Sequence, residues 1–136
     1  MWLREREIET RQVEPMDLLK VEKLPPYRST WMKPVGKLPA DERIHQALLL
    51  YVSDMGLLGA AVNPHEVNFM SKKFQSASLD HVMWFHGKVN FNNWILHHMH
   101  SPISQNARGF SRGSIYTKAG KLIASTAQEG LMRVWD

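Results

Sequence analysis

The sequence predicts an α+β fold in which one long helix is wrapped by a curved antiparallel β-sheet. Residues 41–61 (DERIHQALLLYVSDMGLLGAA) repeat apolar side chains at helical spacing and are apolar on nearly every face. Almost everything after residue 75 is typical of strands that follow one another along the chain. A helix that is apolar on nearly all sides must be covered, and these strands are the part of the chain that can cover it.

The composition predicts one soluble globular domain over residues 1–136. Hydrophobic residues make up 43% and charged residues 22% of the 136 residues, and there is no cysteine. The missing cysteines exclude disulfides, a thiolate nucleophile and cysteine-ligated zinc. The net charge of +4 is not gathered into a basic stripe, so a nucleic-acid partner is not expected. The apolar run 47–52 is too short to span a membrane, and the charged start MWLREREIE does not resemble a signal peptide.

The segment before the helix predicts two strands joined by a connector. Charges of alternating sign in residues 4–13 favour a solvated edge strand, and Pro25–Pro26 indicate a connector over 16–26. Aromatic and β-branched residues over 27–35 predict a strand that Pro34 ends.

The central helix is predicted over 41–61. Asp41 and Glu42 suit its positive end, and Gly56 and Gly59 suit its exit. Asp54 does not fit, because it lies on an apolar face near the negative end of the helix dipole, where a carboxylate is disfavoured. Either its carboxylate reaches solvent or the protein uses it.

Four strand-forming runs follow, over 76–86, 94–101, 107–117 and 121–134, with a tight hairpin at Ala119–Gly120. By the period of two, one face of the last strand carries small or apolar side chains except for Gln128 and Thr126. A buried amide without partners costs about 1–3 kcal/mol, so Gln128 is a second polar exception. One exception lies on the helix and one on the sheet that covers it, so Asp54 and Gln128 could meet.

Several motifs resemble those of the acyl-CoA thioesterase II (TesB-like) family, in consistent order from about Glu9 to Val134. They are Leu50–Asp54 ahead of Asn63–His65, Ser78–His86 (SLDHVMWFH), Ala107–Gly113 (ARGFSRG) and Ser125–Arg133 (STAQEGLMR). The resemblance implies a hot-dog fold, hydrolysis of fatty acyl-CoA to free acid and coenzyme A, and no cofactor or metal. It places the family's aspartate on Asp54, its serine or threonine on Ser78 and its glutamine on Gln128.

The chain departs from the family pattern because members usually carry two hot-dog repeats, and this sequence resembles only the second. The active cleft in such proteins lies where two hot-dogs meet. We therefore expect the chain to form at least a homodimer or to pair with a missing N-terminal half. An open sheet edge and apolar surface on a lone domain favour the same expectation. Trp84 and Phe85 are interpreted as core or interface residues.

The chemistry favours direct attack by water on the thioester. There is no cysteine and no serine in a G-x-S-x-G pattern, so a covalent acyl-enzyme has little support. Asp54 would take the proton of the water, while Ser78 and Gln128 would hold the water in place. The oxyanion donor stays open between a backbone amide and Gln128. Arg108 and Arg112 could meet the phosphates of coenzyme A, although solvated strand charges are the simpler interpretation, because exposed basic residues are common.

Other interpretations remain. The chain could be a catalytically silent hot-dog subunit that binds acyl-CoA or a partner half, or an acyl thioester dehydratase, which would need a histidine beside an acid. His97, His98 and His100 lack an acidic or cysteine ligand nearby in sequence, so we expect no metal. Asp80 and His81 are neighbours that would point to opposite faces of a strand, which favours structural hydrogen bonds. A cytoplasmic location is expected, with the peroxisomal matrix as the alternative, although the ending VWD is no peroxisomal signal.

Overall fold

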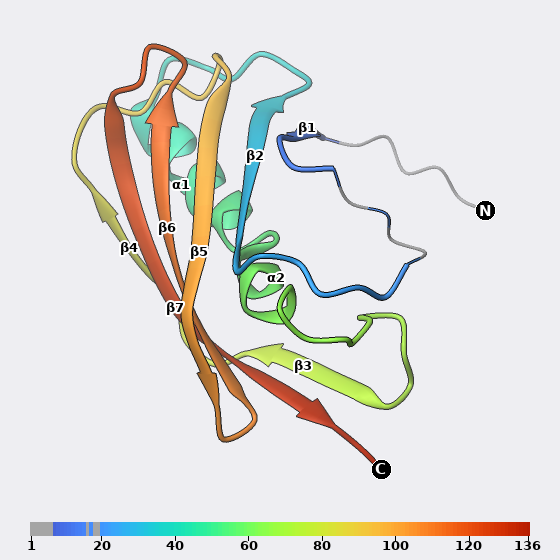
Figure 1. Ribbon diagram of the computed structural model, residues 1–136. Helices are drawn as coiled ribbons and strands as arrows, with labels where there is room; N and C mark the ends of the chain where they lie inside the picture. The colour runs from blue at the N-terminus through green and yellow to red at the C-terminus, as the bar shows by residue number, and fades with distance from the viewer. Residues whose placement is uncertain (1–6, 16, 18–19) are drawn as a thin grey trace.

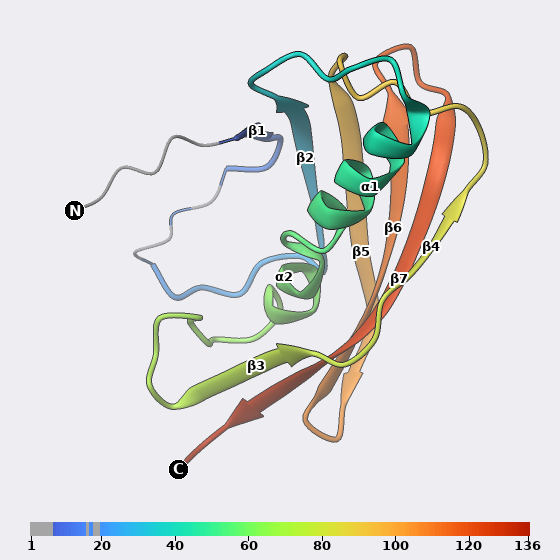
Figure 2. The same ribbon diagram turned by 180° about the vertical axis from the view of Figure 1, so that it is seen from behind.

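The computed structural model describes residues 7–15, 17 and 20–136, and a curved antiparallel sheet wraps around two helices in it (Figures 1 and 2). The helices are α1 (Glu42–Ser53) and α2 (Leu57–Val62). The strands are β1 (Ile8–Gln12), β2 (Tyr27–Pro34), β3 (Phe74–Ser78), β4 (Val82–Phe85), β5 (Ile95–Gln105), β6 (Arg108–Thr117) and β7 (Leu122–Val134). They pair in the order β1-β2-β5-β6-β7-β3, and β4 also pairs with β7. The predicted fold, a helix wrapped by a curved antiparallel sheet, is confirmed.

The N-terminal strands follow the prediction closely. β1 lies at one edge of the sheet, and its only strand partner in the described structure is β2. The first part of the strand expected over 4–13, residues 4–6, lies outside the described residues. β2 ends at Pro34 as predicted. The expected break at Ser101–Pro102 is instead a shift in register within a longer β5, between His100 and Ile103.

The long strand β7 pairs with two strands, β3 and β4, along the same edge. Residues 130–134 pair with β3, and residues 124–127 pair with β4. The single strand expected over 76–86 is therefore two strands, and the connection 79–81 crosses beside the middle of β7. The backbone N–H of Leu79 donates to the carbonyl of Glu129 at 2.9 Å, which keeps this connection against β7. The break in the strand lies where the polar residues of the site converge.

The helix expected over 41–61 is interrupted at residues 54–56. Asp41 caps its start by accepting a hydrogen bond from the backbone N–H of Arg43 at 3.0 Å. The Arg43 side chain, and then its backbone N–H, hold the pKa of the Asp41 carboxyl below its usual range. Gly56 adopts a left-handed conformation (φ 81°), which ends α1 and lets α2 start at Leu57. Asp54 is thereby the C-terminal cap of α1.

The helices are covered on one side only. Leu49, Val52 and Leu57 are fully buried against the sheet, but Leu50, Tyr51 and Met55 are exposed. The expectation of a helix wrapped on all sides is wrong for this chain alone, because the sheet curls around one face (Figure 2). By length and composition the run Glu42–Val62 would suffice to cross a membrane; here it packs against the sheet, as core helices of soluble proteins also do.

The core fills the space between α1 and the strands. Its largest buried side chain is Phe91, which comes from the loop before β5. That loop is tied to α1 by His45, whose Nδ1 accepts from the backbone N–H of Phe91 at 2.9 Å. The remaining buried members of this cluster are Met32, Leu49, Val52, Val89, Ile95, Ile115, Ile123 and Ala124.

His97 is a buried histidine on the helix-facing side of β5, and it makes stability dependent on pH. Burial, and to a lesser degree His81 and His98, lower the pKa of His97 from 6.5 to about 3. In the unfolded chain the imidazole of His97 takes up a proton near pH 6.5, whereas in the folded protein it does so only near pH 3. The stability contributed by neutral His97 is therefore complete above pH 6.5 and is lost as the pH falls through this window.

We expect His97→Gln to remove this acid sensitivity. In the wild type the unfolding equilibrium constant should rise up to about tenfold for each pH unit lowered through the window, in addition to the effect of the carboxylates. Urea unfolding at pH 7, 6, 5 and 4 measures the slope. The exposed His86 offers the control His86→Gln, which should keep the wild-type slope. An unchanged slope in His97→Gln would contradict the prediction.

Candidate active site

A hydrogen-bonded chain joins the three residues that the sequence singled out. The Ser78 hydroxyl donates to Asp54 Oδ1 at 3.2 Å, and Gln128 Nε2 donates to Ser78 Oγ at 3.4 Å. Asp54 comes from the end of α1, Ser78 from the end of β3 and Gln128 from the middle of β7. Asp54 and Gln128 thus meet through a shared hydroxyl, as the two polar exceptions of the pattern predicted they could.

The three side chains differ in their access to solvent. Gln128 is 1% exposed, whereas the Asp54 side chain is 53% exposed. A half-exposed carboxylate keeps its charge at little cost, while a buried amide needs partners. The carboxylate therefore faces open solvent above a buried amide that holds the hydroxyl between them.

Two further residues complete the chain, and sequence reasoning missed them as site residues. His81 Nδ1 lies 2.9 Å from Gln128 Oε1 and 4.0 Å from Asp54 Oδ1, while His81 Nε2 lies 2.8 Å from Ser53 Oγ. The structural hydrogen bond expected for Asp80 is present, since its carboxylate accepts from the backbone N–H of Glu129 at 2.6 Å. One sign of each residue was present in the sequence: both lie inside motifs of the family resemblance, Ser53 in Leu50–Asp54 and His81 in Ser78–His86.

The buried polar side chains continue along the same face of the sheet. Ser111 of β6 pairs with Gln128 across the strands, and its hydroxyl is buried without a hydrogen-bond partner in the part of the chain described. Thr126, two residues from Gln128, has its hydroxyl 3.3 Å from His97 Nε2. The face predicted to be small and apolar except for Gln128 and Thr126 therefore carries a polar strip next to the site.

The two arginines considered for coenzyme A do not join this chain of hydrogen bonds. Arg108 pairs with Glu129 at 3.2 Å, and Arg112 lies over the ring of Phe110. By the alternation of β6, both point away from the face that carries Ser111. Their proposed contact with the substrate remains a prediction.

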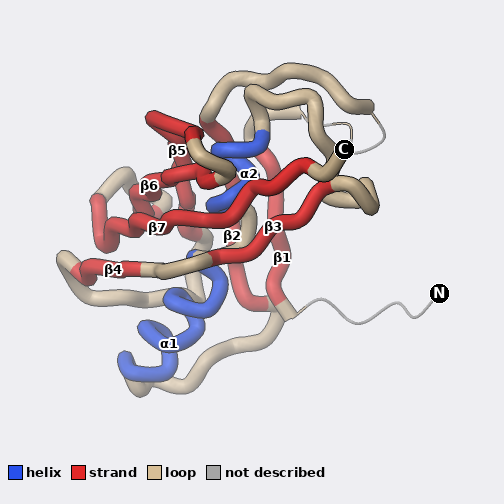
Figure 3. Tube along the Cα trace, turned by 90° about the horizontal axis from the view of Figure 1, so that it is seen from below, coloured by secondary structure: helices blue, strands red, loops and turns tan. Residues whose placement is uncertain are grey.

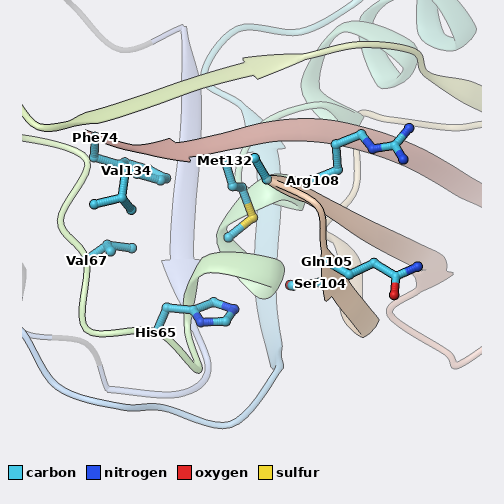
Figure 4. A pocket seen from close by; sticks show the side chains of 9 residues that line it. His65, Val67, Phe74, Ser104, Gln105, Arg108, Met132 and Val134 are labelled. Carbon is cyan, nitrogen blue, oxygen red and sulfur yellow. The ribbon is translucent and has the colours of Figure 1, made fainter. Parts of the chain in front are cut away.

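A separate pocket of about 210 Å³ lies at the C-terminal end of β7 (Figure 4). Its apolar lining includes Val67, Phe74, Met132 and Val134, and Arg108 lies at its rim. None of Asp54, Ser78 or Gln128 lines it. The pocket is therefore distinct from the candidate active site, which is open to solvent in this chain.

His97 and His98 of β5 point to opposite faces of the sheet. His97 faces the helices, whereas His98 points the other way and its Nδ1 lies 2.7 Å from Ser29 Oγ. No group of three His, Cys, Asp or Glu side chains suited to a metal is found among the residues described. The interpretation of these residues as surface histidines is wrong for His97, which is fully buried.

The fold points to the class of protein. A helix wrapped by a curved antiparallel sheet is the hot-dog fold, and the chain superposes on hot-dog thioesterase structures. One is the acyl-CoA thioesterase II TesB2 from Mycobacterium marinum, with a TM-score of 0.79, 32% identity, and coverage of 94% of this chain and 49% of that chain.

The acyl-CoA thioesterase family model matches residues 3–131, so the chain belongs to the acyl-CoA thioesterase family. Acyl-CoA thioesterase 2 of Haemophilus influenzae is 41% identical over 111 residues, which is 82% of this chain and 39% of the relative. Acyl-coenzyme A thioesterase 8 of Mus musculus is 35% identical over 132 residues, 93% of this chain and 39% of the relative. The chain thus spans about 40% of the length of these curated relatives.

Proposed function

We propose that this chain is one hot-dog half of an acyl-CoA thioesterase and hydrolyses fatty acyl-CoA to free fatty acid and coenzyme A. The observation that carries the proposal is the hydrogen-bonded chain from Asp54 through Ser78 to Gln128. It combines a solvent-facing proton acceptor with a buried amide donor, which are the two parts that thioester hydrolysis by water requires. Family membership supplies the class of substrate.

In the proposed reaction, a water molecule at Asp54 attacks the thioester carbonyl carbon. Asp54 accepts a proton from this water as the new C–O bond forms, and the carbonyl oxygen takes up the electron pair of the broken π bond. Collapse of this intermediate breaks the C–S bond, and the thiolate of coenzyme A leaves with the proton that Asp54 held. A positioned general base contributes about 10²–10⁴-fold to such a rate.

We propose that a second hot-dog covers the exposed side of this site. β4 and the loop before it carry exposed large side chains, and so do α1 and the turn after it. Figure 3 shows that α1 runs beside β4. Soluble monomers rarely leave such apolar surface uncovered next to a free strand edge. We call the set the open face: Leu50, Tyr51, Met55, Leu79 and Phe85. A copy of this chain, or a missing N-terminal half, would cover it.

Light scattering should therefore give at least a dimer for the isolated chain. Phe85 is 38% exposed on the edge strand, so Phe85→Arg should shift the chain towards monomer by placing a charge in the contact. Lys37→Ala, at an exposed residue outside the open face, is the control and should leave the mass unchanged. A monomeric wild type at high protein concentration would contradict pairing between copies of this chain.

Release of free thiol from medium- and long-chain acyl-CoA tests the proposed function. Hydrolysis by the wild type supports it, and binding of acyl-CoA without release of thiol would instead favour the silent-subunit interpretation. A dehydratase needs a histidine beside an acid; no histidine lies near Asp54 or Gln128 in sequence, but His81 lies beside both in space. The same samples should therefore be assayed for formation of an enoyl thioester from a 3-hydroxyacyl-CoA, which our proposal expects to be absent.

A further inference from the structure

The donors and acceptors around Gln128 limit how its side-chain amide can be oriented. Asp54 Oδ1 accepts only, and the Ser78 hydroxyl has one proton, which it gives to Asp54. Ser78 Oγ can then only accept from Gln128, so the NH2 group of Gln128 must face Ser78. The carbonyl Oε1 of the same amide then faces His81 and needs a donor from it.

That donor must be the N–H at Nδ1 of His81. If Nδ1 were unprotonated, the amide would have to turn over, and its carbonyl would face Ser78 Oγ. The single Ser78 proton would then have to turn from Asp54, to which Ser78 donates at 3.2 Å, to the buried carbonyl of Gln128. A proton on Nδ1 is the arrangement that keeps the hydrogen bond from Ser78 to Asp54 and also gives the buried carbonyl of Gln128 a donor.

Ser53 suits either protonation state of the other ring nitrogen. Its buried hydroxyl lies 2.8 Å from His81 Nε2 and 2.7 Å from the carbonyl oxygen of Leu50. It can donate to Nε2 of a neutral ring, or accept from a protonated Nε2 while it donates to Leu50. In both cases Nδ1 keeps its proton, and the ring stays aligned between Ser53 and Gln128.

We infer that His81 is a positioning residue whose Nδ1–H fixes the Gln128 carboxamide so that its NH2 group faces Ser78 and the substrate. One hydrogen of that group bonds Ser78, and the second remains for an oxygen of the substrate or of the attacking water. Gln128 then acts as a donor, which favours it over a backbone amide as the group that stabilises the oxyanion. This role rests on the proposed function, but the orientation of the amide does not.

The orientation is tested without any substrate. Nitrogen-15 NMR of the histidines at neutral pH should show the Nδ1 of His81 protonated, with the signal assigned by its loss in His81→Asn. In Gln128→Met, which removes the acceptor, the Nδ1-protonated population should fall. An unprotonated Nδ1 in the wild type would overturn the inference, whether or not the chain hydrolyses thioesters.

Kinetics test the role in the reaction. We expect His81→Leu to lower kcat roughly 10–100-fold with little change in KM, because it leaves the buried carbonyl of Gln128 without a donor. His81→Asn, whose amide nitrogen can replace Nδ1, should recover most of that loss. The double variant His81→Leu/Gln128→Met should be no slower than Gln128→Met alone, because His81 acts through Gln128.

The control is His86→Leu, at an exposed histidine after β4, which should leave kcat unchanged. Losses that multiply in the double variant, or a His81→Asn variant as slow as His81→Leu, would overturn the positioning role. A wild type without thioesterase activity would count against the proposed function alone, because the NMR result would still decide the orientation of Gln128.

Discussion

Asp54→Asn is expected to lower kcat for thioester hydrolysis by about 10²–10⁴-fold, which is the contribution of a positioned general base. Asparagine has nearly the same shape and can still accept the hydrogen bond from Ser78, but it cannot take the proton of the attacking water. Binding should change little, because the Asp54 side chain contributes mainly to the transition state. Steady-state release of free thiol gives kcat and KM separately.

The same substitution should leave the fold at least as stable. Asp54 caps the C-terminal end of α1, where a negative charge meets the negative end of the helix dipole. Neutralising it should stabilise the folded state by about 0.3–1 kcal/mol, reduced by its exposure to solvent. Loss of activity without loss of stability is the expected signature of a residue retained for function. Thermal unfolding of wild type and variant supplies this comparison.

Glu66→Gln is the matched control, because Glu66 is an exposed carboxylate in the loop before β3. It makes the same change from acid to amide, and both kcat and stability should stay at wild-type values. Equal activity in Asp54→Asn and wild type would remove Asp54 from the mechanism and leave the proposed water activation without a base.

The sequence sufficed for the architecture because each main element has a strong local signal. The apolar run in 41–61 and the alternation in residues 121–134 each required burial against another part of the fold. The sequence did not predict the interruption of the helix, because Gly56 is equally suited to the end of a helix and to a turn between two helices. Nor did it predict the exposed Leu50 and Tyr51, because an apolar residue looks alike whether the cover comes from its own chain or from a partner.

The site was predictable in part, for a related reason. Asp54 and Gln128 each break an apolar pattern, so sequence alone singled out both as candidates. Ser78 and His81 break no pattern, and in one continuous strand residues three apart would face opposite sides. The crossing of 79–81 between β3 and β4 removes that alternation and brings both side chains to Gln128. The positions of Ser78 and His81 thus depend on contacts with a strand about 50 residues away in sequence, and the local sequence pattern does not indicate such contacts.

Gly113→Ala is the substitution for which we expect the largest loss of stability. His97 lies on β5 and Thr126 on β7, with β6 between them, so their side chains can meet only by passing over β6. Two strand spacings amount to about 9.5 Å, and the 3.3 Å bond between His97 Nε2 and Thr126 Oγ1 closes that gap above Gly113. A β-carbon at Gly113 would overlap both of these atoms.

Neither neighbour can move aside cheaply, because His97 is 0% and Thr126 2% exposed. Overpacking of this kind, together with a lost buried hydrogen bond, should cost about 2–5 kcal/mol. Urea unfolding measures the cost against Gly36→Ala, where a β-carbon meets no atom within 4 Å and the change should stay within about 0.5 kcal/mol. Equal stability of the two variants would mean that the sheet can shift to make room for a β-carbon at residue 113. The hydrogen bond between His97 and Thr126 would then not require a glycine at this position.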